Sequence, residues 1–266
     1  MDVKDKVAIV TGAGSGIGAA LTRKLVASGA RVTAVDLDEA GVAATIADLG
    51  DKADRVSGRT ADVSNSEAIA ELIEHTRTTF GPVDLYFANA GIIGPRDLGD
   101  SDEDWLRTID VNTLAHVRAA RLLVPEWLER GSGYFIATAS AAGLLSQIGA
   151  AAYSTTKAAA VGFADWMSIT YGDRGIGVSC LCPQGVNTAM LNQDSESGSV
   201  GARVVTGAGA VLEPDDVADI VLKAVNDEQF LILPHPEVGE YMARKANDRE
   251  RWLRGMRRLQ AKASGN

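Results

Sequence analysis

The feature that most constrains the fold is a regular alternation of short apolar runs with longer segments of helical periodicity. Two strands joined through a helix pair in parallel, because the chain crosses over before it returns to the sheet. We therefore predict a single α/β domain with a doubly wound, seven-stranded parallel sheet and helices on both faces. The predicted strands are Val7–Thr11, Arg31–Asp36, Val56–Val63, Val83–Asn89, Tyr134–Ser140, Ile176–Cys182 and Phe230–Leu233.

The segments outside these strands are predicted to be helices, a lid and a C-terminal extension of the same domain. No linker or repeat divides residues 1–266, so we predict one domain. Residues 189–211 are predicted to form a mobile lid over the substrate, because Asn192–Gly209 is rich in small and polar residues. Residues 237–266 are predicted to be a helical extension. The other predicted helices are Ala19–Ser28, Asp38–Leu49, Ser66–Thr79, Asp104–Leu128 and Ala151–Tyr171.

Composition and charge argue against several classes of protein. A net charge of −9 disfavours general binding of nucleic acid or anionic membranes. No apolar run reaches the roughly 20 residues of a membrane span, and the charged N-terminus does not resemble a signal peptide. Cys180 and Cys182 are poorly spaced for a disulfide on one strand, so we expect buried thiols and a cytoplasmic protein. His75, His116 and His235 lie far apart, and no metal site is predicted.

A glycine-rich turn, Thr11–Gly18, follows the first predicted strand and opens a helix. Glycines let the backbone approach a pyrophosphate, and a helix N-terminus offers free N–H groups and a positive dipole end. No lysine follows the glycines, which excludes the nucleotide-triphosphate P-loop. A purely structural tight turn is the alternative interpretation of this segment.

Asp36 ends the second predicted strand. A carboxylate at this position accepts hydrogen bonds from the hydroxyls of an adenosine ribose and repels a 2′-phosphate. Neither Leu37 nor Ser15 supplies the positive charge that a phosphate needs. The alternative is a helix N-cap, for which Asp36 or Asp38 would serve.

Tyr153 and Lys157 lie four residues apart on a predicted helix and therefore share one face. A nearby ammonium is expected to lower the pKa of the Tyr153 phenol and make it a proton carrier for an alcohol. Ser140, at the end of the fifth predicted strand, could orient the substrate oxygen towards Tyr153. The alternative is an exposed Tyr–Lys pair on an ordinary amphipathic helix.

Taken in order, these motifs resemble the short-chain dehydrogenase/reductase family over roughly residues 4 to 235. The resemblance implies a Rossmann fold, an NAD cofactor and hydride transfer between nicotinamide and a secondary alcohol or ketone. It implies the catalytic residues Asn112, Ser140, Tyr153 and Lys157, with Asn112 anchoring a water that links Lys157 to solvent. An amide that merely satisfies a helix interruption is the alternative for Asn112.

The resemblance also implies which residues hold the cofactor. Asp62 and Val63 match positions beside adenine, Val186 and Thr188 match positions at the nicotinamide carboxamide, and Lys157 would contact the nicotinamide ribose. The expected cofactor-binding residues are Gly12, Ser15, Gly16, Ile17, Gly18, Asp36, Leu37, Asp62, Val63, Asn89, Ala90, Gly91, Tyr153, Lys157, Pro183, Val186 and Thr188.

Two positions depart from the family pattern. Ala88 replaces the first of two asparagines, and Gln184 replaces a glycine after Pro183. Gln184 puts the local backbone shape in question and could place an amide near the substrate.

The substrate is predicted only as a class. Most residues that flank the motifs are apolar, which suggests a hydrophobic or ring-bearing alcohol, although several could simply pack the loops. These residues are Ile92, Ile93, Leu144, Leu145, Ile148, Met190 and Leu191. Gln147 and Gln184 could add polar contacts.

Assembly is predicted from two segments. The helix Ala151–Tyr171 is apolar nearly all round, so we expect a homo-oligomer, with a tetramer as the expected form. The basic, amphipathic segment Tyr241–Lys262 could bind a membrane or nucleic acid, but packing on an acidic neighbouring subunit is the favoured interpretation.

Two other functions remain open on this fold. One is a non-catalytic NAD-sensing or scaffold protein, against which Ser140, Tyr153 and Lys157 argue. The other is an NAD-assisted epimerase or dehydratase, which the fold alone does not exclude.

Overall fold

A computed structural model describes residues 1–207 and 209–265, and its central element is one parallel sheet in the order β3-β2-β1-β4-β5-β6-β7. The order reverses direction between β1 and β4, which is the switch point of a doubly wound sheet. The predicted single-domain fold is therefore confirmed. The strands are β1 (Val7–Thr11), β2 (Arg31–Asp36), β3 (Val56–Thr60), β4 (Leu85–Ala88), β5 (Gly133–Thr138), β6 (Ile176–Leu181) and β7 (Leu231–Ile232).

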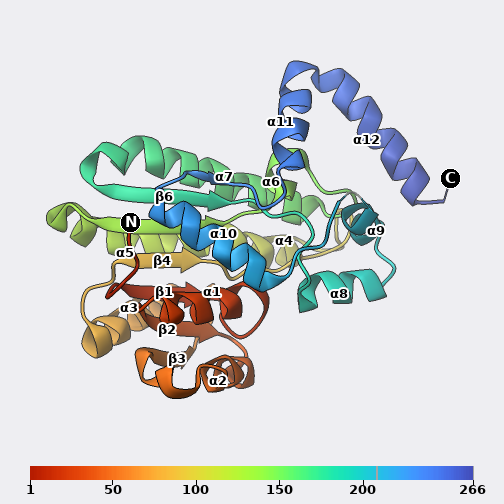
Figure 1. Ribbon diagram of the computed structural model, residues 1–266. Helices are drawn as coiled ribbons and strands as arrows, with labels where there is room; N and C mark the ends of the chain where they lie inside the picture. Colours follow the sequence, from red (N-terminus) through yellow and green to blue (C-terminus); the bar gives the residue numbers. More distant parts are fainter. Residues whose placement is uncertain (208, 266) are drawn as a thin grey trace.

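Helices cover both faces of the sheet (Figure 1). Side chains of α1, α2 and α10 form one apolar cluster with the sheet, and those of α3, α5 and α7 form the other. The strands β1, β4 and β5 are buried throughout, as expected where both faces are covered. These helices are α1 (Gly16–Ala27), α2 (Glu39–Ala47), α3 (Ser66–Phe80), α5 (Ala115–Arg130), α7 (Ala151–Tyr171) and α10 (Pro214–Asn226).

The predicted continuous helix Asp104–Leu128 is wrong in one respect. The chain forms α4 (Asp102–Ile109), then a π-turn η2 (Asp110–Leu114), and only then α5. The Asn112 side chain lies in this π-turn and bonds both backbone groups of Ile92, at 2.8 Å each. Single π-turns inside helices occur often at functional sites.

A buried histidine lies one turn further along the same helix. His116 is 1% exposed, and neither ring nitrogen has a hydrogen-bond partner within the described part of the chain. Burial, together with the nearby charge of Lys157, lowers the pKa of His116 to about 3. The imidazole is therefore a neutral core side chain.

The segment after β6 is more regular than its composition suggested. It forms α8 (Ala189–Glu196) and α9 (Val200–Gly207), with the Thr188 hydroxyl accepting a bond from the Leu191 amide at the start of α8. Only Gly201 and Ala202 are buried in these two helices. The mobility predicted for residues 189–211 stays a prediction.

The C-terminal segment is two helices rather than one. α11 (Glu237–Asn247) packs against α6 (Ala141–Leu145), and α12 (Arg249–Ala263) packs against α9. Asp248 separates them, and its carboxylate accepts a bond from the Arg251 amide at 2.8 Å, which starts α12. Figure 1 shows the two helices as an angled pair beyond the sheet, and α12 buries no residue.

The described residues contain neither a membrane-spanning helix nor a cluster of metal-ligating side chains. None of their helices combines the length and the hydropathy that a bilayer crossing requires. No three side chains of His, Cys, Asp or Glu come together there in a way that could hold a metal ion.

Candidate active site

A cleft of about 350 Å³ runs along the carboxyl ends of the central strands. Gly12 follows β1, Asp36 ends β2, Asn89 follows β4 and Ser140 follows β5, and all four line it. Parallel strands place their carboxyl ends at one edge of the sheet, and the cleft lies where the strand order reverses. Of the predicted site residues, only Gly18 and Asn112 do not line this cleft.

The glycine-rich turn forms one wall. Gly12 and Gly16 have φ angles of 69° and 51°, which L side chains rarely adopt. A Cβ on Gly16 would lie 2.9 Å from the Thr188 Cγ2 atom across the cleft. The Ser15 side chain does not cap α1, so the first amides of this helix stay available to an anion.

Gly18 has a packing role. A Cβ at this position would lie 2.0 Å from the carbonyl oxygen of Gly12. The absence of a side chain therefore allows α1 to begin directly against the turn. Gly18 therefore supports the glycine-rich wall of the cleft without lining it.

Asp36 lies at the end of β2 beside the same turn. Its carboxylate accepts bonds from the Gly14 amide at 2.9 Å and the Asp38 amide at 3.1 Å. The N-cap of α2 is Asp38, whose side chain accepts a bond from the Ala40 amide, so Asp36 is not needed as a cap. A carboxylate accepts about four bonds, which leaves capacity for ribose hydroxyls.

The far end of the cleft is held by polar contacts. The Asn89 side-chain amide donates to the carbonyl of Thr11 at 2.9 Å, which ties the end of β4 to β1. Burial raises the pKa of the Asp62 carboxyl, but bonds from Ser64 and the charge of Arg107 outweigh it and lower the pKa. Asp62 and Arg107 form an ion pair of 3.8 Å at the cleft.

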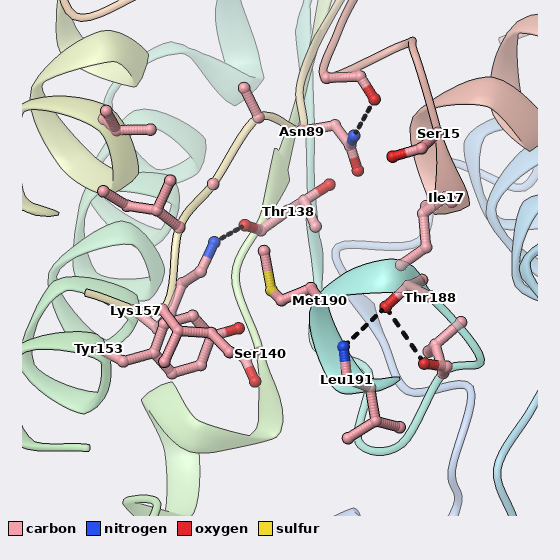
Figure 2. A pocket seen from close by; sticks show the side chains of 18 of the residues that line it. Ser15, Ile17, Asn89, Thr138, Ser140, Tyr153, Lys157, Thr188, Met190 and Leu191 are labelled. Carbon is pink, nitrogen blue, oxygen red and sulfur yellow. Dashed lines mark hydrogen bonds between the residues drawn. The ribbon is translucent and has the colours of Figure 1, made fainter. Parts of the chain in front are cut away.

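Ser140, Tyr153 and Lys157 lie together on the opposite wall from Ser15 (Figure 2). The Lys157 ammonium lies 5.7 Å from the centre of the Tyr153 ring and donates to the Thr138 carbonyl at 2.8 Å. Lys157 is 3% exposed. The predicted face shared by Tyr153 and Lys157 is thus turned into the cleft, not to solvent.

The electrostatics differ from the predicted lowering of the phenol pKa by Lys157. Burial raises the pKa of Tyr153, and the nearby Ser140 hydroxyl lowers it only in part. Burial also lowers the pKa of Lys157 to about 8, partly offset by the sulfurs of Cys182 and Cys180. In this arrangement the phenol keeps its proton at neutral pH.

Asn112 lies behind the cleft and is fully buried. Its side-chain nitrogen also donates to the Thr156 hydroxyl at 3.1 Å, so its oxygen and nitrogen both have protein partners. A water held at this residue would therefore need the main chain of the π-turn. The predicted relay role stays a prediction.

The loop after β6 accommodates Gln184 without losing its predicted contacts. The backbone N–H of Gln184 donates to the His235 Nδ1 atom at 3.1 Å, which fixes the loop. Val186 and Thr188 still line the cleft. The Gln184 side-chain oxygen is buried and has no hydrogen-bond donor in the described ranges. It is an acceptor that a ligand could use.

Several residues that line the cleft were not among the predicted site residues. These are Val35, Ala61, Arg107, Val111, Thr138 and Ala139, whereas Asp194 and Val205 lie inside the predicted lid segment 189–211. Arg107 comes from α4, whose approach to the cleft no local pattern indicates. Thr138 and Ala139 could have been found, because they directly precede Ser140 at the end of β5.

The residues predicted to flank the substrate divide between two cavities. Ile92, Ile93, Met190 and Leu191 line the cleft. Leu145 and Ile148 line a second, adjoining cavity of about 980 Å³, whereas Leu144 lines neither and packs against the core.

Comparison with known proteins agrees with this geometry. The family model for short chain dehydrogenases matches residues 6–198. The chain is 32% identical to 1-deoxy-11-beta-hydroxypentalenate dehydrogenase of Streptomyces avermitilis, over 93% of this chain and 91% of that protein. It is 32% identical to 3beta-hydroxysteroid dehydrogenase 2 of Eggerthella lenta, over 85% and 90%.

A solved structure extends the likeness to the whole fold. A short chain dehydrogenase/reductase from Burkholderia phymatum, in complex with NAD, superposes with a TM-score of 0.85 at 28% identity, covering 94% of this chain and 96% of that one. The sheet order, the match over most of the chain and these relatives agree. The chain therefore belongs to the short-chain dehydrogenase family of oxidoreductases.

Proposed function

We propose that the protein is an NAD-dependent oxidoreductase that moves a hydride between nicotinamide and a hydrophobic secondary alcohol or ketone. One observation carries the proposal: Ser140, Tyr153 and Lys157 line the same cleft as the glycine-rich turn and Asp36. A sensor or scaffold needs only the second group of residues. Nicotinamide, when bound, supplies or accepts the hydride.

Each polar group of the wall has a distinct task. The Ser140 hydroxyl orients the substrate oxygen, and the Tyr153 hydroxyl transfers the proton to or from that oxygen. Because burial raises the pKa of Tyr153, the phenol is protonated and ready to donate to a ketone. Lys157 would bind the nicotinamide ribose, and a water at Asn112 would return the proton from solvent.

NAD is the proposed cofactor because the Asp36 carboxylate, at the end of β2 beside the glycine-rich turn, would repel the 2′-phosphate of NADP. Leu37 beside it is 57% exposed and carries no charge, so nothing there offsets the carboxylate. The remaining predicted residues, from Gly12 to Thr188, would hold the pyrophosphate, adenine and carboxamide. The Burkholderia phymatum relative is a complex with NAD.

A hydrophobic substrate is proposed because Ile92, Ile93, Met190 and Leu191 line the same cleft as Tyr153. The relatives named above are dehydrogenases of a hydroxypentalenate and of a hydroxysteroid.

An NADH absorbance assay over a panel of secondary alcohols and ketones tests the proposed function. Turnover that Tyr153→Phe abolishes supports it. No absorbance change with any compound would favour the sensor, and product without net NADH change would favour an epimerase or dehydratase.

Assembly, lid and location are separate proposals. A homotetramer is supported by outward apolar side chains on α7 and α5, where Trp166, Ile169 and Leu122 are 52%, 84% and 39% exposed. Light scattering that gives a monomer mass contradicts it.

Residues 189–211 act as a lid if hydrogen exchange there slows with NADH and substrate. A cytoplasmic location fits the free, buried thiols of Cys180 and Cys182 and is tested by cell fractionation.

A further inference from the structure

The second cavity adjoins the catalytic wall. Ser140, Gln147, Gln184 and Val205 line both the cleft and this cavity of about 980 Å³. A ligand whose reacting oxygen lies at Ser140 can therefore extend into the second space. Its volume is at the upper end of the range for small-molecule sites.

Apolar side chains from separate parts of the chain form most of the wall. They come from α6 and the loop after it, from α9, and from the pair α11–α12, which Figure 1 places on the outer side of α6 and α9. The apolar lining residues are Ala141, Ala142, Leu145, Ile148, Val204, Val205, Tyr241, Trp252, Met256 and Leu259. This surface fits the body of a large apolar molecule.

The α12 wall adds positive charge. Arg251, Gly255 and Arg258 all line the cavity and lie four and three residues apart, on one face of the helix. A Cβ on Gly255 would lie 3.9 Å from the Arg258 Nη2 atom, so the guanidinium lies over the glycine. The small residue leaves room between the two arginines.

Neither of these two arginines forms an ion pair within the part of the chain that the structure describes. The third arginine at the cavity, Arg244, pairs with Glu240 at 3.1 Å and stacks on the Tyr241 ring. Asp248, the acidic residue of the lining, uses its carboxylate to cap α12. No ion pair to Arg251 or Arg258 occurs among residues 1–207 and 209–265.

We propose that the substrate is an apolar hydroxy or keto acid, whose body fills the second cavity and whose carboxylate binds Arg251 and Arg258. The inference rests on the proposed oxidoreductase function. A guanidinium binds a carboxylate through two parallel hydrogen bonds, which gives both charge and geometric recognition. The apolar wall then selects the size of the molecule, and the arginines select its charged end.

The kinetic test compares each acid with its own methyl ester, which keeps the shape and removes the charge. The probes are 9-hydroxydecanoate and 4-(4-hydroxycyclohexyl)butanoate, with NAD as the acceptor. The wild-type protein should prefer the acids by about tenfold in kcat/KM, mainly through KM, which is the scale of charge-assisted hydrogen bonds. The double variant Arg251→Ala/Arg258→Ala should lose the preference and keep its activity on the esters.

The matched control is Arg254→Ala/Arg257→Ala. It removes the same charge from the same helix at exposed residues that do not line the cavity. It should keep the acid preference. If both double variants lose the preference equally, the effect is general electrostatic attraction and the proposal is overturned. Equal kcat/KM for acids and esters in the wild type overturns it as well.

A binding arm separates this inference from the proposed function. Calorimetric titration with 4-cyclohexylbutanoate and its methyl ester needs no hydride transfer, because neither compound has a hydroxyl. Tighter binding of the acid that depends on Arg251 and Arg258 supports the anion site even if no alcohol is oxidised. Equal binding of acid and ester removes the site even if the enzyme is active on neutral alcohols.

Discussion

Replacement of Lys157 by methionine should change how the free energy of unfolding depends on pH. The same replacement should abolish activity, because Lys157 belongs to the proposed catalytic group. Burial lowers the pKa of Lys157 from 10.5 to about 8, so holding the ammonium inside the folded protein at pH 7 costs about 3 kcal/mol. Methionine fills a similar volume without charge. The variant also leaves the Thr138 carbonyl without its hydrogen-bond donor, which costs about 1–3 kcal/mol. The net gain in the free energy of unfolding at pH 7 is therefore small.

The pH dependence is the sharper readout. Between pH 8 and 10.5 the unfolded chain holds a proton on Lys157 that the folded chain has released, so wild-type stability rises with pH in this window. The Lys157→Met variant lacks this rise. Relative to the variant, the wild type should gain about 2 kcal/mol between pH 7 and pH 10.

Urea unfolding of both proteins at pH 7, 8, 9 and 10, at one protein concentration, measures the difference. The exposed Lys52→Met serves as the control and should show no such trend. A difference between wild type and Lys157→Met that stays constant across these pH values would refute the reasoning. The variant should also lose turnover and bind NADH more weakly.

Three further predictions concern single side chains. Tyr153→Phe should lower kcat on the order of 10²–10⁴-fold with the NADH dissociation constant nearly unchanged, and a variant that keeps most of its rate contradicts the assignment. Asp36→Ala should reduce the ratio of the NADPH to the NADH dissociation constant about tenfold in paired binding titrations, because it removes a repulsion of about 1–4 kcal/mol. Tighter binding of NADPH than of NADH by the wild type would exclude the proposed role of Asp36. Gly18→Ala should lower the free energy of unfolding by about 1–3 kcal/mol, since its Cβ would lie 2.0 Å from the Gly12 carbonyl oxygen. Gly172→Ala, with open space around it, should melt near the wild type, and equal melting temperatures of the two variants would disprove the clash.

Much of the cleft could be predicted from the sequence because parallel strands impose a shared edge. Once Val7–Thr11, Arg31–Asp36 and Gly133–Thr138 are known as parallel strands, the residues after them must converge. Gly12, Asp36 and Ser140 did so. The expected pairing therefore followed from local patterns together with the topology.

What could not be predicted depends on contacts between residues distant in sequence. The π-turn at Asn112 is accompanied by bonds to the backbone of Ile92, twenty residues earlier, which no helical periodicity encodes. The Tyr153 pKa depends on burial by several elements, so the spacing to Lys157 alone gave the wrong direction. The break in the tail, by contrast, had a local signal, since Asp248 is a capping residue.

His116 sets an acid limit on this enzyme. Because the unfolded chain takes a proton there near pH 6.5 and the folded chain not until about pH 3, acidification favours unfolding throughout that interval. At pH 5 the loss is about 2 kcal/mol, a substantial part of the 5–15 kcal/mol typical of a folded protein. Activity that is lost on mild acidification should therefore be accompanied by a loss of folded structure. Above about pH 6.5 neither the folded nor the unfolded chain binds this proton, so the penalty is absent.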